Sequence, residues 1–213
     1  MAKNAVKPDK DNTIPPNEDV RLTYSQMDDE SLVEACKKKD DGAFSELMRR
    51  YTSSMYHFAV QYAKNEEDAE DIAQDAFFKA WKYIQRFKTG GKFRPWIYAI
   101  TRNTALDHLK KKRAFSFSDL DNNDVDLDFA DTLEDPEPLP DKVFADQELG
   151  NRLDEAMSVL HPDHGAVLIM HYRDGMTFDE ISVVLKKPMN TVKSWHRRAL
   201  LKMRERLVQH HLR

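Results

Sequence analysis

The sequence is short of the residues and segments that impose covalent or membrane constraints on a chain. Cys36 is its single cysteine, so no disulfide can form within the chain, and we expect a reducing compartment. No apolar run approaches the roughly 20 residues that a membrane-spanning helix requires, and the N-terminus lacks the apolar stretch of a secretory signal. These features exclude a disulfide-stapled secreted fold and predict a cytoplasmic protein without membrane insertion.

Glycine is also scarce, with six glycines among 213 residues, whereas 33% of the residues are charged and 40% are hydrophobic. This composition favours an all-α protein over a sheet-rich one. The length fits one large domain or two small ones. The net charge of −4 conceals a strong segregation of charge along the chain.

Charge and periodicity divide the chain into four parts. Residues 116–148 hold twelve acids and one base, which gives −11 and leaves +7 for the rest. Three prolines in the same stretch stiffen the chain, and we therefore expect residues 114–148 to form an acidic, extended linker. Residues 1–27 are polar and rich in proline, which predicts a disordered tail. Helical spacing of apolar residues over 28–113 and 149–213 predicts two small helical domains.

The linker contains Asp-x-Asp patterns that raise the question of a calcium loop. Counted from Asp119 or Asp124, the sixth position is not glycine and the twelfth is not glutamate, as a calcium loop requires. A solvated acidic strap is the favoured interpretation, and a second is that its carboxylates imitate nucleic acid in a basic channel of a partner. We expect no metal site and no cofactor.

The segment TFDEISVVLKKPMNTVKSWHRRALLKMRERL predicts two helices joined by a short turn. Thr177 and Glu180 form a capping box that starts the first helix, and Pro188 ends it. We expect Asn190 to be the N-cap of the second helix. Inward-facing residues are expected at Ile181, Val184 and Leu185 of the first helix and at Val192, Ala199 and Met203 of the second.

The second of these helices is strongly basic, as the recognition helix of a helix-turn-helix is. Residues near the start of this helix would reach the edges of DNA bases, while lysine and arginine side chains further along would neutralise phosphates. We place Asn190, Thr191, Lys193, Ser194, Arg197 and Arg198 in or beside the major groove. A solvated amphipathic helix is the alternative, but the two caps, the proline turn and the one-sided charge favour DNA.

The segment DAEDIAQDAFFKAW predicts a helix with two different faces. At 100° per residue, one face is expected to be core and comprises Ala69, Ile72, Ala73, Ala76, Ala80, Tyr83, Ile84 and Phe87. The opposite face carries Asp71, Gln74, Asp75 and Phe78. Acids at the start of a helix complement its dipole, but this does not explain an outward phenylalanine. A protein-docking surface does, and we favour it over catalysis or a metal site.

The segment FKTGGKFRPWIYAITRNTALDHLKKKR interleaves aromatic and basic residues after a glycine pair. Gly90 and Gly91 interrupt the helix and let the backbone bend. Aromatic and basic side chains beside such a loop can bind single-stranded nucleic acid or an extruded nucleobase. For Trp96 a place in the core is the favoured interpretation, whereas the basic residues and Asn103 indicate a nucleic-acid surface.

These three motifs, in this order and spacing, resemble group IV (extracytoplasmic function) of the bacterial sigma-70 family. The resemblance covers residues 28–113 as the sigma-2 domain and 149–208 as the sigma-4 domain. It implies a non-enzymatic transcription initiation factor that binds core RNA polymerase, reads −35 and −10 promoter elements and melts the −10 region. The implied partners are the polymerase β′ clamp coiled coil and β flap, double-stranded and melted promoter DNA, and an anti-sigma factor as a further candidate.

By the same resemblance, Asp71, Gln74, Asp75 and Phe78 meet the β′ clamp, and the 87–94 loop holds a flipped −10 base. The residues implied at −10 DNA are Lys88, Lys92, Phe93, Arg94, Arg102, Asn103 and Lys110. Asn190, Trp195 and His196 differ from the residues usual at these positions in the family, and these differences affect which −35 sequence the chain would prefer. The rival hypotheses are a helix-turn-helix regulator that is not a polymerase subunit, which leaves the Phe78 face unused, and a carboxylate-dependent nuclease.

Overall fold

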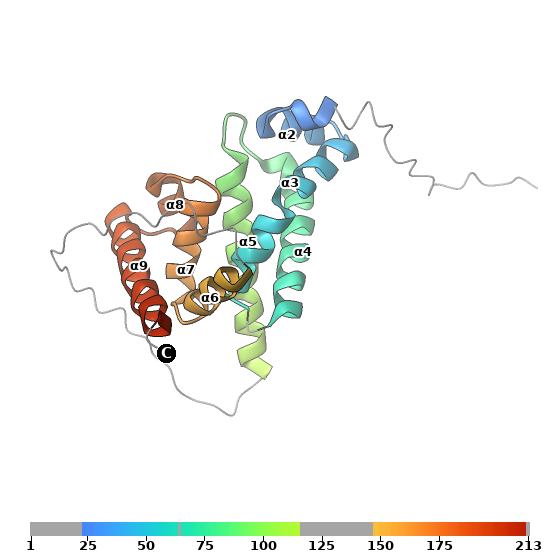
Figure 1. The fold of residues 1–213 in the computed structure, drawn as a ribbon. Coiled ribbons are helices and arrows are strands. Elements are labelled where there is room, and N and C mark those ends of the chain that lie inside the picture. The colour runs from blue at the N-terminus through green and yellow to red at the C-terminus, as the bar shows by residue number, and fades with distance from the viewer. Residues whose placement is uncertain (1–22, 64, 116–146, 212–213) are drawn as a thin grey trace, which may run out of the picture.

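The computed structural model describes residues 23–63, 65–115 and 147–211, and every element assigned in those ranges is a helix. The N-terminal half comprises α2 (Asp29–Lys37), α3 (Asp41–Val60), α4 (Glu66–Tyr83), the 3-10 turn η1 (Ile84–Arg86) and α5 (Phe93–Phe115). The C-terminal half comprises α6 (Gln147–Ser158), α7 (Pro162–Leu168), the π-helical turn η3 (Ile169–Arg173), α8 (Phe178–Leu185) and α9 (Met189–His211). Figure 1 shows α5 between the two halves. The all-α prediction is confirmed for this part of the chain.

Side-chain caps fix where several helices begin. The carboxylate of Asp28 accepts from the Ser31 N–H at 2.7 Å, and that of Asp40 accepts from the Ala43 N–H at 3.1 Å. Asn65 caps α4 through the Asp68 N–H, also at 2.7 Å. Each cap satisfies an N–H that has no partner within its helix, so the sequence itself sets these boundaries.

The predicted disordered tail is wrong at its C-terminal end. Residues 23–26 are helical, and the Tyr24 hydroxyl donates to Asp40 at 2.9 Å. Gly42 makes this approach feasible, because a Cβ there would lie 2.7 Å from the Tyr24 ring. Residues 1–22, and most of the expected acidic linker, lie outside the described residues.

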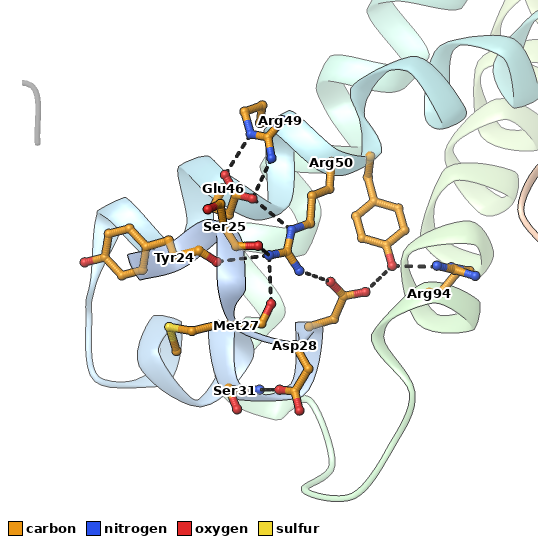
Figure 2. A network of polar contacts seen from close by, with 11 residues as sticks. Tyr24, Ser25, Met27, Asp28, Ser31, Glu46, Arg49, Arg50 and Arg94 are labelled. Carbon is orange, nitrogen blue, oxygen red and sulfur yellow. Dashed lines mark hydrogen bonds and ion pairs between the residues drawn. The ribbon is translucent and has the colours of Figure 1, made fainter. Parts of the chain in front are cut away.

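A network of polar contacts around Arg50 holds this N-terminal turn against α3 (Figure 2). The guanidinium donates to the carbonyls of Tyr24, Ser25 and Met27 at 2.7–3.1 Å. It also pairs with Asp29 and Glu46, each at 2.9 Å. One partly buried arginine thereby satisfies three backbone carbonyls that belong to no regular ladder.

A second, smaller apolar cluster joins α6, α7 and α9, but the main cluster runs through both halves of the described chain. In the N-terminal half it is built on side chains that are at most 1% exposed, among them Leu47, Met55, Phe58, Ile72 and Ile97. The same cluster continues into the C-terminal half through residues of α7, η3, α8 and α9, including Ala166, Met170, Ile181 and Trp195, and through Met176 in the turn before α8. The two predicted domains therefore pack against each other here.

Gly165 of α7 lies against the side chain of Gln61 at the contact between the halves. A Cβ at this position would lie 2.0 Å from Oε1 of Gln61, the residue that follows α3. A side chain at this position would displace the end of the flexible Gln61 side chain, so Gly165 allows that side chain to lie directly against α7.

Glu46 generates a prediction about stability and pH. The hydrogen bond from Arg49 is the main cause that lowers the pKa of this carboxyl from 4.5 to about 2, with Arg50 adding to it. A carboxyl whose pKa is lower in the folded state stabilises the fold above pH 4.5, and this stabilisation is lost as the pH falls toward 2. A full shift of this size corresponds to about 3 kcal/mol, and solvent screening reduces it to about 1–2 kcal/mol.

We therefore expect Glu46→Gln to lower the unfolding free energy by about 1–2 kcal/mol at pH 7, and the difference from wild type to shrink between pH 4.5 and pH 2. Urea unfolding followed by circular dichroism at several pH values measures this. Glu34→Gln, which removes an exposed carboxylate paired with Lys37, is the matched control and should change little at either pH. A difference at Glu46 that is independent of pH would contradict the assignment.

Candidate nucleic-acid and partner interfaces

The outward face of α4 carries the four side chains predicted for docking. Asp71, Gln74, Asp75 and Phe78 are all exposed, and Phe78 is 67% exposed, among the highest values for a large apolar side chain in the described residues. Within the described residues, the Phe78 ring belongs to neither apolar cluster, so the packing of the fold does not explain it. Such residues are typical of protein-binding surfaces.

Phe78 stands at the edge of an open groove between α3 and α4, with a volume of about 1050 Å³. The groove is lined mainly by apolar side chains, with Phe44 and Met48 from α3 and Phe77 and Trp81 from α4. The rings of Phe44 and Trp81 lie 4.8 Å apart and form part of its wall. Sequence reasoning found the α4 side of this surface but missed the α3 side, although Met48 lay in the apolar spacing of that helix.

The expected core face of α4 is confirmed at seven of its eight residues, and one assignment is wrong. Tyr83 is 37% exposed, and the cations of Lys82 and Arg86 lie 5.8 Å and 5.3 Å from its ring centroid. Phe77, which was not assigned, is buried instead. Tyr83 is the last residue of α4, and its ring lies against Lys82 and Arg86 instead of in the core.

The loop between η1 and α5 presents basic side chains on a turn that requires glycine. Gly90 has φ +80°, which other residues rarely adopt. Lys88, Lys92 and Arg94 are exposed around it. A hollow of about 480 Å³ separates this loop from α2, and Phe87, Thr89 and Gly90 line its loop side.

Phe93 does not belong to the exposed loop, and its assignment to the DNA-binding set is corrected. It is 1% exposed, and its ring packs against those of Tyr51, Trp96 and Phe87 at centroid distances of 5.3, 5.7 and 6.3 Å. The preference for a core position at Trp96 is consistent with its partly buried place beside the same rings. This aromatic cluster anchors the loop, and the neighbouring basic side chains of Lys92 and Arg94 remain exposed to solvent.

The basic residues predicted along α5 are in two different environments. Asn103 and Lys110 are exposed and lie two turns apart on one face of the helix. Arg102 has a side chain that is only 12% exposed. Its Nη2 donates to Asp163 of α7 at 3.0 Å, and its Nε donates to the same carboxylate at 3.2 Å.

Asp163 is one of three C-terminal acids that contact polar and basic groups of the N-terminal half. It also accepts from the Tyr62 hydroxyl at 2.7 Å. Asp174 accepts from the Ser54 hydroxyl at 2.7 Å and from the Tyr98 hydroxyl, and its backbone carbonyl accepts from Arg94 at 2.5 Å. The third, Glu180, pairs with Lys92 at 2.6 Å.

Sequence reasoning missed these three contacts. Glu180 was explained by its capping box, and Asp163 and Asp174 were ordinary acids in a helical region. Burial is the main cause that raises the pKa of the Tyr62 and Tyr98 hydroxyls, and the adjacent carboxylates add to it. Both hydroxyls are therefore protonated donors, which fixes the direction of the hydrogen bonds between the two halves.

The C-terminal helix pair has the predicted helix-turn-helix form, with a shifted start for its second helix. The Thr177–Glu180 capping box is present, and all six residues expected to face inward are buried. The predicted N-cap at Asn190 is wrong, because α9 begins at Met189 and the Val192 N–H bonds to the Pro188 carbonyl at 3.1 Å. Proline lacks an N–H, so its carbonyl can start the helix at no cost to a backbone donor.

The residues predicted to read DNA lie on the first turns of α9. Asn190 and Lys193 are exposed, and Thr191, Ser194, Arg197 and Arg198 are partly buried. The Ser194 hydroxyl donates to the Thr191 carbonyl at 2.8 Å, which holds it to the helix. Trp195 is buried in the core and His196 approaches the Tyr172 hydroxyl at 3.1 Å, so these two residues support the helix.

No metal or membrane site accompanies these surfaces. Within residues 23–63, 65–115 and 147–211 no group of three histidine, cysteine, aspartate or glutamate side chains could hold a metal ion. The acidic patterns tested for calcium lie outside these ranges. Among the described residues, no helix combines the length and apolar character needed to cross a membrane.

Comparison with known proteins gives matches over both halves. The family described as Sigma-70 region 2 matches residues 47–115, and the family described as Sigma-70, region 4 matches residues 150–203.

Two curated relatives and one solved structure extend these matches. The ECF RNA polymerase sigma factor SigW of Bacillus subtilis is 28% identical over 176 residues, 82% of this chain and 94% of that protein. The ECF RNA polymerase sigma factor SigE of Mycolicibacterium smegmatis is 26% identical over 168 residues, and the match spans 79% of this chain but only 63% of that relative. The sigma factor RpoE in complex with the anti-sigma factor NepR from Bartonella quintana has a similar fold, with TM-score 0.59 at 21% identity over 77% of this chain and 96% of that one.

Proposed function

The chain belongs to the extracytoplasmic function group of the sigma-70 family, and we propose that it directs core RNA polymerase to promoters through three surfaces. The α4 face around Phe78 docks on the polymerase. The 87–94 loop and α5 contact the −10 element, and the start of α9 contacts the −35 element. The protein acts by binding and not by catalysis, and it works in the cytoplasm beside the polymerase.

The exposure of Phe78 carries the docking assignment. Phe78 is 67% exposed at the edge of the apolar α3–α4 groove, and Asp71, Gln74 and Asp75 surround it. A helical partner that covers Phe78 would bury its ring and the groove wall together, while the two carboxylates meet basic residues at the rim. This combination of a central aromatic anchor and a charged rim is typical of binding hot spots, and the β′ clamp coiled coil is the partner that fits it.

The −10 assignment rests on basic groups that surround a glycine-dependent loop. Lys88, Lys92 and Arg94 are exposed on or next to the loop, and Asn103 and Lys110 continue this character along α5. Melted DNA offers phosphates to the lysines and arginines and unstacked bases to the loop. The hollow between α2 and the loop is the place where we expect an extruded −10 base.

The −35 assignment rests on the helix-turn-helix geometry of α8 and α9. The exposed Asn190 and Lys193 stand at the N-terminal end of the second helix, which enters the major groove in such motifs. Lys202 and Arg204 are exposed further along α9 and are suited to phosphates. We also propose that an anti-sigma factor regulates the chain, since a structural relative is found in complex with one.

Phe78→Ala should weaken binding to core RNA polymerase by about tenfold or more, because truncation of a central aromatic anchor typically costs at least about 2 kcal/mol. Its unfolding free energy should stay within about 0.5 kcal/mol of wild type, since the ring contributes nothing to the core. Surface plasmon resonance against immobilised core measures the first quantity, and urea unfolding measures the second.

Val60→Ala is the matched control, because Val60 is 40% exposed on α3 and does not line the groove. It should bind core as wild type does. Equal affinity of Phe78→Ala and wild type for core would refute the docking assignment.

Lys193→Ala and Lys202→Ala should weaken DNA binding in two different ways. Loss of a base contact at Lys193 should cost about 1–3 kcal/mol on the preferred −35 sequence and relax selectivity. Loss of a phosphate contact at Lys202 should weaken all sequences alike and reduce the salt dependence of binding by about one counterion. Anisotropy titrations with preferred and scrambled −35 duplexes separate the two, and unchanged selectivity in Lys193→Ala would remove that residue from the reading set.

A further inference from the structure

We propose that Lys37, the last residue of α2, is a positioning residue for the loop assigned to the −10 element. Its ammonium ties the tip of the 87–94 loop to α2 and thereby fixes the width of the hollow assigned to an extruded base. This inference deepens the proposed function and rests on it, because it concerns the residue that shapes that binding site. Lys37 acts through Thr89 and Glu34 and makes no contact with DNA of its own.

The tip of the loop is a tight turn that requires glycine. The Gly91 N–H donates to the Lys88 carbonyl at 3.0 Å, and Gly90, between them, has φ +80°. These features fit a type II turn in which Thr89 and Gly90 are the two central residues. A Cβ at Gly91 would lie 3.0 Å from the Lys88 carbonyl oxygen and 3.3 Å from the Phe87 ring, so this position also favours glycine. The turn therefore presents the Thr89 side chain at a defined point.

Lys37 holds the Thr89 side chain from α2. Its Nζ donates to Oγ1 of Thr89 at 3.3 Å and to Oε1 of Glu34 at 2.8 Å, and it lies 5.7 Å from the centroid of the Phe87 ring. An ammonium has three donors and is attracted to an aromatic face within about 6 Å. The Lys37 side chain is only 16% exposed, so little of it is left for a phosphate. The contacts of Lys37 with Thr89 and Glu34 thus form a bridge between the loop and α2.

Two further contacts join the same elements. The side-chain amide of Gln85 in η1 donates to the Lys37 carbonyl at 2.9 Å, and the Thr89 hydroxyl donates to Oε1 of Glu34 at 3.5 Å. The loop that precedes α5 lies beside α2 (Figure 1). The end of α2 therefore holds both the start of the loop and its tip, and this conformation is present without DNA.

The bridge joins opposite walls of the hollow. Thr89 belongs to the loop wall, together with Phe87 and Gly90, whereas Glu34 belongs to the α2 wall. Lys37 does not line this space of about 480 Å³, so it links the walls without filling the place of a base. The bridge therefore sets the separation of the two walls. A loop that is ordered before its ligand binds saves the entropy cost of ordering it, which raises the affinity for that ligand.

Lys37→Met tests the bridge, because methionine keeps an unbranched side chain and lacks the ammonium. The probe is a fluorescent pool of random single-stranded DNA of about 12 nucleotides, titrated into the full chain. We expect the affinity to fall by about three- to tenfold, as for a loop that adopts the binding conformation in about 10–30% of molecules. The slope of log affinity against log salt concentration should stay as in wild type, because no phosphate contact is lost.

Lys39→Asn is the matched control, because it removes an equal charge from the same end of α2. Lys39 is exposed and has φ +67°, a conformation that asparagine tolerates, so the substitution adds no strain. The affinity should change by about twofold at most, since water and salt screen an exposed charge. An equal loss in Lys37→Met would assign that loss to general charge, and a lower salt slope in Lys37→Met would make Lys37 a phosphate contact. Either result overturns the positioning role.

Thr89→Val removes the other end of the bridge and retains the shape of the side chain. It should reproduce the loss seen in Lys37→Met. The double variant should bind no more weakly than Lys37→Met alone, because both substitutions break the same contact. Losses that add in the double variant would show that the two residues act separately and would contradict the bridge.

Hydrogen exchange of the chain without DNA measures the order of the loop directly. In Lys37→Met the Gly91 amide should exchange faster than in wild type, because the turn opens more often when its tip is released. Amides of α3 should keep their wild-type rates, which separates a released loop from a misfolded chain. Wild-type exchange at Gly91 in this variant would overturn the proposal.

Failure of the positioning role is distinguishable from failure of the proposed function. Lys88→Ala with Lys92→Ala removes two lysines proposed to contact −10 DNA, so it should weaken binding of the pool and lower the salt slope by about 1.4. If this variant loses affinity while Lys37→Met matches Lys39→Asn, the positioning role alone is wrong. If this variant binds the pool as wild type does, the −10 assignment of the loop is wrong whatever Lys37→Met shows.

Discussion

The burial of α5 between two groups of helices is the constraint on which the rest of the structure depends. Tyr98, fully buried near the start of this helix, packs its ring edge-on against Phe58 at 4.8 Å and donates its hydroxyl to Asp174 of the C-terminal half. One side chain thus contributes to the apolar core and to the polar contact between the halves. Because α5 also carries Arg102, Asn103 and Lys110, the packing that stabilises the fold decides which predicted DNA contacts are accessible.

This arrangement leaves some of the proposed binding surfaces exposed to solvent and partly covers another. The α4 face around Phe78 is exposed, and the groove between α4 and α3 is open, with the Ser53 hydroxyl in its lining accepting a hydrogen bond from Arg173 of η3. The start of α9 presents Asn190 and Lys193 to solvent, while Trp195 fixes the helix in the core. Among the basic residues predicted at −10 DNA, Arg102 is the most buried, with a side chain that is 12% exposed and paired with the carboxylate of Asp163.

Local signals in the sequence predicted the helices well, because caps and apolar spacing are short-range features. The Thr177–Glu180 box, the inward residues of α8 and α9, and the exposed Phe78 followed from them. Tyr83 was misplaced at the last residue of α4, and Asn190 was misplaced because α9 begins two residues earlier than a cap at Asn190 implies, which propensity does not resolve. Phe93 was misplaced because an aromatic residue beside lysines fits a core and a DNA surface equally well. The Asp163 and Asp174 contacts join residues 61 to 120 positions apart, and no local pattern encodes such a pairing.

Reconstitution with core RNA polymerase tests the central claim most directly. Purified chain, bacterial core polymerase and fragments of genomic DNA are combined, and the 5′ ends of the transcripts are mapped. The account predicts that the chain co-purifies with core and that transcripts start at defined positions, downstream of shared −35 and −10 sequences, only when the chain is present. Absence of co-purification together with absence of any chain-dependent start site would contradict it.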